Sequence, residues 1–428
     1  MKLLRNLLLL VTGLLLLIAV AAPGVIGPQV ETVWQEQLGR IEGLERSEYR
    51  RGWFGAETQM QIATGDGPAV LRSEIQHGPL LFTSGGPRLG AVYSVTTLET
   101  EQLPQPLRAQ LRAFYGRLAH SPVRLETVVG VDNNIDNTLR LQPFARSDAG
   151  GELEFAGAEL VLQTDYSGAV LSGAVRLGEI RRREGDHEKF YSQAADGQLT
   201  IVPGRSLEGG LQWPLVKAET ESGPVELRRV RLDLALNLTG GGVKLESIFT
   251  APQVQSATPV SAVSQRILVP EVAPAVLAHY VSQLLPPTGG RNWAEVFGPP
   301  LSLQQQLLVE SANGPAMVDA DIDWRGYRTG AGGGAQISEQ WPMPMPGQAA
   351  GAAQWLAPMT GIIQVTAAEQ ALLQSPLIGQ TLLLRQYGLL EKKDGELQML
   401  LEVKRGDLKV NGQRLPADLF LMALTGQF

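Results

Sequence analysis

The sequence predicts a β-rich α+β protein, in which an N-terminal transmembrane helix precedes extended, curved antiparallel sheets with a few packed helices. Three observations lead to this fold class: a long apolar segment at the N-terminus, many short alternating runs separated by turn residues, and few stripes of helical period. Of the 428 residues, 44% are hydrophobic, which is enough to bury a sizeable core.

The N-terminal segment has the length and the flanking charges of a membrane span. Lys2 and Arg5 precede an apolar stretch from Leu7 to Ile26, and about twenty residues of helix cover roughly 30 Å, the thickness of a bilayer core. Basic residues before the span and Glu31 after it predict a bacterial inner-membrane protein with a cytoplasmic N-terminus and a periplasmic body. The alternative is a signal peptide cleaved after Ala19-Val20-Ala21, which would release a soluble periplasmic protein. The continuation of the apolar stretch to Ile26 favours the anchor.

Composition narrows the possible partners and cofactors. The net charge of −7 argues against nucleic acid, because phosphate binding requires a clustered positive surface. The chain has no cysteine, which excludes disulfides, thiolate zinc sites, Fe–S clusters and a lipid-modified N-terminal cysteine. The fold is therefore expected to depend on packing alone.

Alternating runs bounded by Gly, Pro, Asn and Asp continue along most of the chain. This period of two is typical of strands with one buried and one solvated face. The clearest lies in Val225–Leu238, where every second residue from Val230 onward is Val or Leu and the residues between them are polar or, at Ala235, small. Similar runs predict further strands at Glu57–Ile62, Ala69–Ile75, Val123–Val131, Asn137–Leu141, Glu152–Phe155, Glu159–Thr164, Val170–Leu177, Gly197–Val202, Leu389–Lys392, Glu396–Lys404 and Leu408–Val410.

Helices are predicted at four places, from apolar stripes at helical spacing or from proline at a first turn. They cover Pro106–Leu118, Val272–Leu285, Ala367–Leu384 with a break or kink at Pro376, and Pro416–Leu424. The expected organisation is an anchor or signal peptide (1–27), a β-rich periplasmic body (28–328), a Gly/Ala/Pro-rich loop (329–353), and a C-terminal helix plus β-hairpin segment of the same fold (354–428).

Three short motifs occur in a fixed order along the chain. They are Tyr49-x-x-Gly52-Trp53-Phe54, then His77-Gly78-Pro79, and near the end Gly406-x-Leu408-x-x-Asn411-Gly412. Together with a single N-terminal anchor, this order resembles the YdgA family of Gram-negative bacteria over nearly the full length. That family is a domain of unknown function, so the resemblance implies a topology but no activity, catalytic residue or cofactor. The motif positions are expected to have structural roles.

The histidines predict no metal site. None of His77, His120, His187 and His279 has a partner at metal-ligand spacing, and no His-Glu-x-x-His occurs. His77 has two interpretations: a base or ligand, or a turn residue whose ring caps a backbone group. We favour the turn residue, because the sequence gives His77 no evident nucleophile to activate.

Three acidic or amide residues after the Val123–Val131 run have part of a calcium-loop pattern. Asp132, Asn134 and Asp136 have its one-three-five spacing, but Asn137 replaces glycine at position six and Pro143 replaces glutamate at position twelve. A polar turn between strands fits these residues better. No catalytic residue, cofactor or metal ligand is therefore predicted.

Two further groups of residues were assigned by composition. Tyr49, Trp53 and Phe54 are either an interfacial aromatic belt or part of the β core, and we favour the core because they lie well beyond the apolar stretch. Arg181-Arg182-Arg183, followed closely by acidic residues, is interpreted as a mixed solvated loop.

The sequence favours a non-enzymatic envelope protein. The apolar strand faces exceed what the few helices can cover, so a groove for a lipid acyl chain or another apolar envelope ligand is the first hypothesis. A membrane-tethered scaffold that recruits protein partners through edge strands or the 329–353 loop is the alternative. A hydrolase built on His77 is the third hypothesis, and no catalytic motif supports it.

Overall fold

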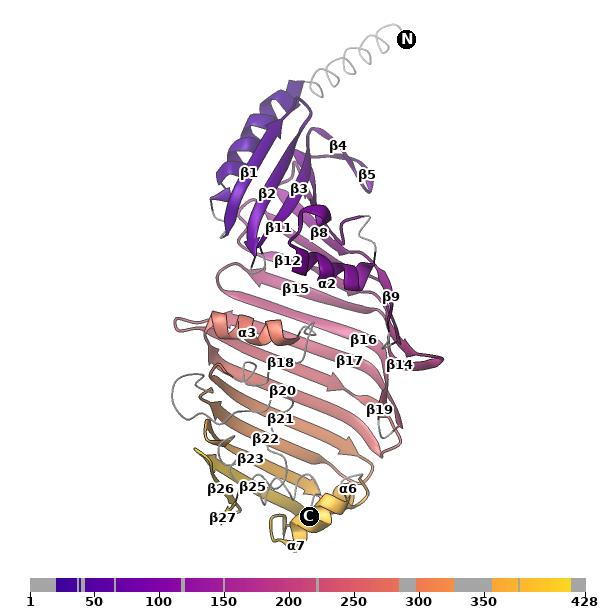
Figure 1. The fold of residues 1–428 in the computed structure, drawn as a ribbon, viewed down its shortest axis with the longest axis vertical. Coiled ribbons are helices and arrows are strands. Elements are labelled where there is room, and N and C mark those ends of the chain that lie inside the picture. Colours follow the sequence, from indigo (N-terminus) through magenta and orange to yellow (C-terminus); the bar gives the residue numbers. More distant parts are fainter. Residues whose placement is uncertain are drawn as a thin grey trace, which may run out of the picture. The chain divides into compact units, whose positions relative to one another are not determined.

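The computed structural model (Figure 1) describes residues 21–36, 38–39, 43–64, 67–116, 120–148, 151–220, 223–284, 298–326, 356–375 and 378–416. The predicted loop 329–353, nearly all of the predicted helix Pro416–Leu424 and most of the apolar stretch Leu7–Ile26 lie outside these ranges. Within them, no helix combines the length and the hydropathy that a membrane crossing requires. The chain divides into two compact units, Met1–Pro203 and Gly204–Phe428.

The described part of the chain is strand-rich with few helices, which confirms the predicted β-rich class. The first unit contains β1 (Leu44–Arg51), β2 (Gly55–Thr64), β3 (Gly67–His77), β4 (Leu80–Thr83), β5 (Gly86–Leu89), β6 (Val92–Leu98), η1 (Thr100–Gln102), α2 (Gln105–Tyr115), β7 (Val123–Val129), β8 (Asn134–Leu141), β9 (Phe144–Asp148), β10 (Gly151–Phe155), β11 (Ala158–Asp165), β12 (Leu171–Leu177), β13 (Ile180–Glu184), β14 (His187–Ser192) and β15 (Ala195–Val202).

The strands of the first unit form an antiparallel sheet. From β1 the pairing runs through β2, β3, β6, β7, β8, β11 and β12 to β15. A second set pairs in the order β9, β10, β13 and β14. The short β4–β5 hairpin is inserted between β3 and β6, and Leu81 on it is buried against Tyr93 and Val128.

A helix of residues 21–36 precedes β1 and lies beside it in Figure 1. Its side chains reach the first strands: Glu31 forms an ion pair with Arg51 at 2.7 Å, and the ring of Trp34 lies 6.4 Å from that of Tyr49. This helix therefore covers one face of the sheet at β1–β3.

The second unit is also built mainly of antiparallel strands. It contains β16 (Ser206–Thr220), β17 (Gly223–Leu238), β18 (Val243–Ala251), β19 (Gln253–Gln255), β20 (Val260–Val272), α3 (Pro274–Leu284), β21 (Leu301–Ser311), β22 (Ala316–Trp324), β23 (Met359–Ala368), α6 (Glu369–Leu373), α7 (Ile378–Gln386), β24 (Glu391–Lys393), β25 (Glu396–Lys404), β26 (Asp407–Val410) and β27 (Gln413–Leu415). The main pairing order is β16, β17, β18, β20, β21, β22, β23, β25, β26 and β27.

The prediction of a helix over Ala367–Leu384 with a break or kink at Pro376 is confirmed except at its first two residues, which are the last two of β23. The helical part is divided into α6 and α7 on either side of Pro376. Arg181-Arg182-Arg183 is not a loop but part of β13, since each arginine pairs across to β10 and β14. The prediction of a loop at these three arginines was therefore wrong, because pairing with neighbouring strands outweighs a local pattern of composition.

Candidate functional site

The most extensive feature of the second unit is a continuous apolar face on its sheet. Strand register places one residue from each of eight neighbouring strands in a single row, because each residue is the direct partner of the next. The row consists of Leu211, Leu232, Phe249, Gln265, Leu307, Val318, Val365 and Met399.

The adjacent row on the same face is similar in character. It consists of Gly209, Leu234, Ser247, Ile267, Gln305, Ala320, Ile363 and Leu401. No position in the two rows, which we call the apolar face, carries a charge. On the opposite face the sheet is charged, as where Asp233 and Arg266 flank Ile248.

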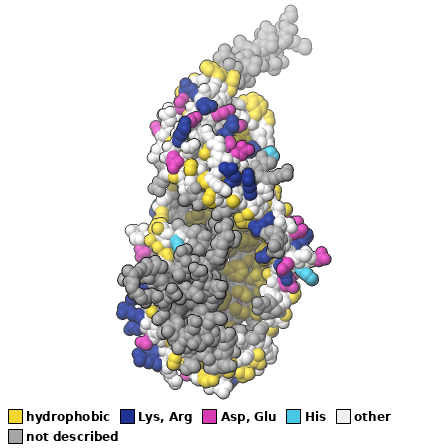
Figure 2. All heavy atoms as spheres, in the orientation of Figure 1, with side chains coloured by type: hydrophobic (Ala, Val, Ile, Leu, Met, Phe, Trp, Pro, Cys, Tyr) yellow, Lys and Arg dark blue, Asp and Glu magenta, His cyan; other side chains and the backbone are white. Residues whose placement is uncertain are grey.

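Described helices cover only parts of this face. Val276 and Leu277 of α3 pack on the cluster that contains Val243 and Val269, which lies beside the two rows toward one end of strands β17, β18, β20 and β21. Where the rows reach β23 and β25, the buried cluster around Leu397 includes residues of β23, β25, β26 and α7. Outside these clusters, side chains such as Leu232 and Leu307 remain partly exposed. Figure 2 shows a hollowed, hydrophobic surface beside the atoms drawn in grey.

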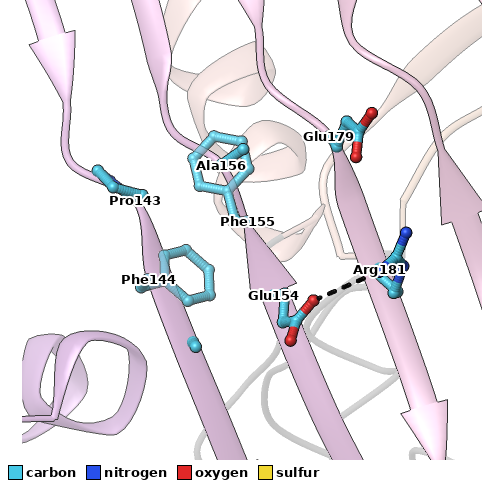
Figure 3. A pocket seen from close by; sticks show the side chains of 8 residues that line it. Pro143, Phe144, Glu154, Phe155, Ala156, Glu179 and Arg181 are labelled. Carbon is cyan, nitrogen blue, oxygen red and sulfur yellow. Dashed lines mark ion pairs between the residues drawn. The ribbon is translucent and has the colours of Figure 1, made fainter.

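A smaller depression lies in the first unit, where β9, β10 and β13 begin or end (Figure 3). Its volume is about 350 Å³, and Phe144 and Phe155 contribute its aromatic lining. Arg181 is the cationic group, but Glu188 lies 3.3 Å and Glu154 4.0 Å from its guanidinium. Because two carboxylates already neutralise this arginine, the depression does not favour an anionic ligand.

His77 of the His-Gly-Pro motif packs against the N-terminal helix. His77, at the end of β3, is buried, and a Cβ placed on Gly27 of the helix would lie 3.1 Å from both Cε1 and Nδ1 of its ring. The side chain of Arg51, which pairs with Glu31, also lies beside Gly27. Gly27 therefore allows helix and ring to approach more closely than any larger residue would permit.

Burial determines the ionisation of His77. Desolvation lowers its pKa, the backbone of Trp53 opposes this effect, and the charge of Arg51 lowers the pKa further. Neither ring nitrogen makes a hydrogen bond of ordinary geometry within the described residues. A neutral ring held against the helix backbone has the environment of a packing residue, because a general base requires a hydrogen-bonded partner within reach.

The remaining residues of the first motif form the end of β1 and its turn. Tyr49 lies under Trp34 of the helix, and burial raises the pKa of its hydroxyl. The N–H of Gly52 donates to the carbonyl oxygen of Gly55 at 2.8 Å, which closes the β1–β2 turn. Trp53 and Phe54 in this turn are 58% and 60% exposed. The prediction that these two side chains lie in the β core was wrong, because the turn carries them past the end of the sheet.

The His-Gly-Pro motif leads from β3 into the β4–β5 hairpin through a cis peptide bond between Gly78 and Pro79. The N–H of Gly78 donates to Ala91 at 2.7 Å, and the carbonyl oxygen of Pro79 accepts from Gly90 at 3.0 Å. A Cβ at Gly78 would lie 1.8 Å from the carbonyl oxygen of Gly90. Only glycine fits at this crossing of two backbone segments.

The C-terminal motif residues organise a turn between β26 and β27. Leu408 is buried in the cluster around Leu397, and both Asn411 and Gly412 have positive φ, at 49° and 80°. The side-chain oxygen of Asn411 accepts from the N–H of Leu400 at 2.8 Å, and its amide donates to Leu389 at 3.3 Å. Asn411 thus connects the turn to two other segments.

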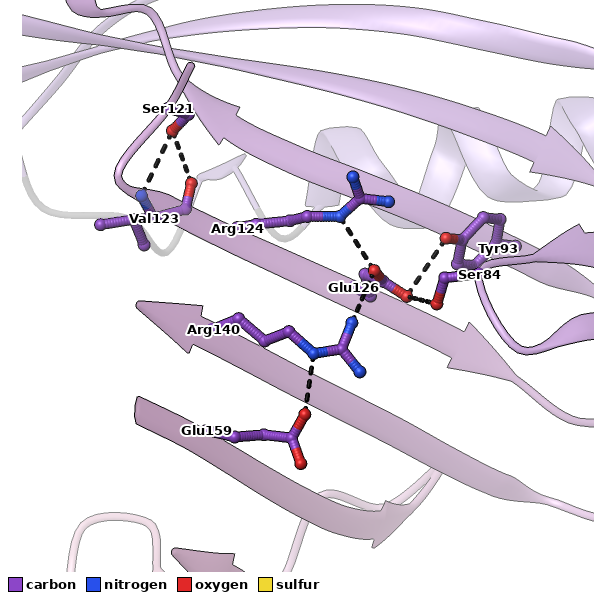
Figure 4. Close-up of polar contacts among 8 residues, drawn as sticks. All are labelled: Ser84, Tyr93, Ser121, Val123, Arg124, Glu126, Arg140 and Glu159. Carbon is purple, nitrogen blue, oxygen red and sulfur yellow. Dashed lines mark hydrogen bonds and ion pairs between the residues drawn. The ribbon is translucent and has the colours of Figure 1, made fainter. Parts of the chain in front are cut away.

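A buried carboxylate network was not predicted from the sequence (Figure 4). Glu126 on β7 is 6% exposed and accepts from the hydroxyls of Ser84 at 2.6 Å and Tyr93 at 3.2 Å. Arg124 and Arg140 each donate to its other oxygen at 2.9 Å. Burial acts to raise the pKa of Glu126, but the Ser84 hydrogen bond and the two arginines outweigh it, so the pKa lies below its usual value.

This network ties the β4–β5 hairpin to the sheet, because Ser84 lies between those two strands. The available signal in the sequence was the pair Arg124 and Glu126, which are two residues apart and therefore share one face of a strand. Neither Ser84 nor Arg140 could be assigned to it without the register.

The rejected calcium motif lies in and after the β7–β8 turn. The amide of Asn134 donates to Asp132 at 2.8 Å, whereas Asp136 is engaged by Arg88 at 2.7 Å. Among the described residues, no group of three or more His, Asp or Glu side chains is placed to hold a metal ion.

Fold and site together describe a strand-rich protein with the first two motifs gathered around the buried His77 in one unit and an apolar sheet face in the other. A family model described as "Bacterial protein of unknown function (DUF945)" matches residues 1–190, so this part of the chain is similar to that family. Comparison with the curated proteins and with the solved structures found no match. The resemblance to a bacterial family of unknown function is thus supported for the first unit, and nothing supports the narrower YdgA name.

Proposed function

We propose that this chain is a periplasmic protein, held at the inner membrane by its N-terminal segment, whose second unit binds a lipid acyl chain without catalysing a reaction. The observation that carries the proposal is the uncharged row of side chains from Leu211 to Met399 across eight strands. The part of this row from Leu211 to Val318 is partly exposed, and an exposed apolar surface is typical of a binding site.

The dimensions of the exposed part suit an acyl chain. The rows cross β16, β17, β18, β20, β21 and β22, and these six strands, at a spacing of ~4.8 Å, cover roughly 24 Å. One acyl chain spans about half of the ~30 Å bilayer core, or about 15 Å, and fits within that distance. The three polar residues among the two rows, Ser247, Gln265 and Gln305, are uncharged, so they do not impose the desolvation cost of a buried ion.

The alternative is a scaffold that pairs with protein partners through an edge strand. The described edge strand β1 is poorly suited to such pairing. Its paired neighbour among the described strands is β2, and one of its faces carries the exposed side chains of Arg46 and Arg50 with Glu48 between them. Charged side chains on an edge strand disfavour pairing with a further chain. The 329–353 loop remains the other route for this alternative.

The test uses neighbouring residues on opposite faces of one strand. We would replace Leu307, on the apolar face, with the photo-crosslinking amino acid p-benzoylphenylalanine, in the full chain within Gram-negative cells. Leu308 is the matched control, because its side chain lies on the other face. A second pair, Phe249 and Ile248 on β18, repeats the comparison.

Irradiated protein is then purified and its adducts identified by mass spectrometry. We expect phospholipid adducts at 307 and 249 and none at 308 and 248. Equal lipid labelling on the two faces, or none on either, would contradict the proposal. Protein adducts confined to 307 and 249, without lipid, would also contradict it, because the apolar face would then bind a protein partner.

A further inference from the structure

Exposed apolar side chains of the first unit gather where several of its strands begin or end, and we call this side of the sheet the edge of strand ends. Trp53 and Phe54 lie in the β1–β2 turn, and the β4–β5 hairpin and the residues after β7 supply the others. We call this set the apolar rim: Trp53, Phe54, Leu80, Phe82, Leu89 and Val131, with exposed fractions from 45% to 72%. Figure 2 shows hydrophobic side chains at this end of the unit.

Strand register shows that these residues share an edge. His77 at the end of β3 pairs with Val92 at the start of β6, and Val92 pairs with Val129 at the end of β7. The turns that follow or precede these positions therefore lie along one edge. Hydrogen bonds join them further.

Two hydrogen bonds hold the β1–β2 turn and the β4–β5 hairpin to the end of β3. The N–H of His77 donates to the carbonyl oxygen of Phe54 at 2.9 Å, and the N–H of Phe82 donates to the side-chain oxygen of Gln76 at 3.0 Å. Because Gln76 and His77 are consecutive, Phe54 and Phe82 are both held at the end of β3.

The apolar N-terminal stretch meets the structure at this edge. A Cβ on Gly24 would lie 2.8 Å from the ring of Trp53, so the helix residues that end the Leu7–Ile26 stretch are beside the rim. The other end of β2, at Thr64, belongs to the opposite edge, because β2 has ten residues and a strand rises about 3.3 Å per residue.

We propose that the apolar rim inserts into the interfacial layer of a phospholipid bilayer, which orients the first unit with this edge toward the membrane. The inference rests on the proposed membrane attachment and adds a second, independent contact. Tryptophan and other aromatic residues favour the headgroup level of a bilayer. The transfer of an exposed apolar side chain such as Phe82 out of water is favourable. The apolar stretch beside Trp53 brings a membrane to this edge rather than to Thr64.

The absence of cysteine from the sequence allows site-specific labelling. Phe82→Cys and, separately, Val131→Cys are labelled with the environment-sensitive fluorophore NBD in the full chain. Thr64→Cys, exposed at the other end of β2, is the control. Each protein is reconstituted in vesicles of phosphatidylethanolamine and phosphatidylglycerol that contain lipids with a nitroxide quencher near the headgroup. Thermal unfolding confirms that each variant folds like the parent.

We expect blue-shifted emission and quenching at 82 and 131, and neither at 64. Co-flotation of the chain with vesicles reports the membrane attachment separately. Flotation without quenching at 82 and 131 would overturn the rim alone, and equal quenching at 64 would overturn the edge-on orientation. A chain that does not float would overturn the attachment and the inference with it. None of these outcomes depends on acyl-chain binding by the second unit, which cross-linking at Leu307 measures separately.

Discussion

The imidazole ring of His77 lies directly against the backbone of Gly27, which joins the end of β3 to the N-terminal helix. His77 is 3% exposed, so the ring has little room to move away. Helix 21–36 is thus held to the sheet where Gly27 meets His77, and the two residues fit together only because Gly27 has no side chain.

Replacement of Gly27 tests this contact. Gly27→Ala should lower the free energy of unfolding by about 1–3 kcal/mol, because the new Cβ would be 3.1 Å from two buried ring atoms. Gly39→Ala is the matched control, since the nearest atom there is at 3.6 Å, an ordinary contact. Denaturation of the full chain in detergent, followed by tryptophan fluorescence, measures both. Equal effects of the two substitutions would show that the helix is not tightly packed at Gly27.

The buried His77 should also make stability depend on pH. Its folded pKa lies below the unfolded value of about 6.5, so the unfolded chain takes up a proton first as the pH falls. The stability is therefore fully present above pH ~6.5 and is lost as the pH falls through the folded pKa. His77→Gln should flatten this part of the pH profile, whereas His187→Gln, at an exposed position of β14, should not. Unchanged pH profiles in both variants would argue against a buried neutral ring.

Glu126 should contribute a second, more acidic dependence. Its folded pKa lies below the usual 4.5, so its contribution is present above that value and is lost as the pH falls through the folded pKa. Glu126→Gln should cost about 2–3 kcal/mol at neutral pH, because two arginines lose a buried charged partner, and should reduce the acid dependence.

Glu159→Gln is the control for Glu126. Glu159 also pairs with Arg140, at 2.8 Å, but its side chain is 36% exposed, so the loss should stay below about 1 kcal/mol. Thermal unfolding across the acid range measures both variants. A larger loss at Glu159 than at Glu126 would contradict the central place of Glu126 in the network.

In the second unit, Asn411→Ala should destabilise the chain by about 1–2 kcal/mol. Alanine would lose the hydrogen bonds to Leu400 and Leu389 and would have to adopt a positive φ. Asp394→Ala removes a side chain at a comparable φ of 52°, in the turn between β24 and β25. It should cost less, since Asp394 makes no side-chain hydrogen bond among the described residues. Equal losses would mean that backbone conformation alone explains Asn411.

Local patterns in the sequence determined the fold class and several elements. The alternation in Val225–Leu238 corresponds to β17, and the apolar stripes at Pro106–Leu118 and Val272–Leu285 correspond to α2 and α3. Asp394-Gly395 and Asn411-Gly412 form the expected turns, with positive φ at all four residues. These features were accessible because side-chain period and turn conformation depend on near neighbours in the chain.

Only the tertiary structure decided what those elements bring together. The register aligned eight strands so that Leu211 and Met399 end one apolar row, and the packing of helix 21–36 placed Gly24 beside Trp53. The structure also has Trp53 and Phe54 exposed, whereas their residue types had predicted a place in the core. Sequence periodicity specifies which face of a strand is apolar, but not what covers that face, because covering groups come from distant segments whose position depends on the packing of the whole unit.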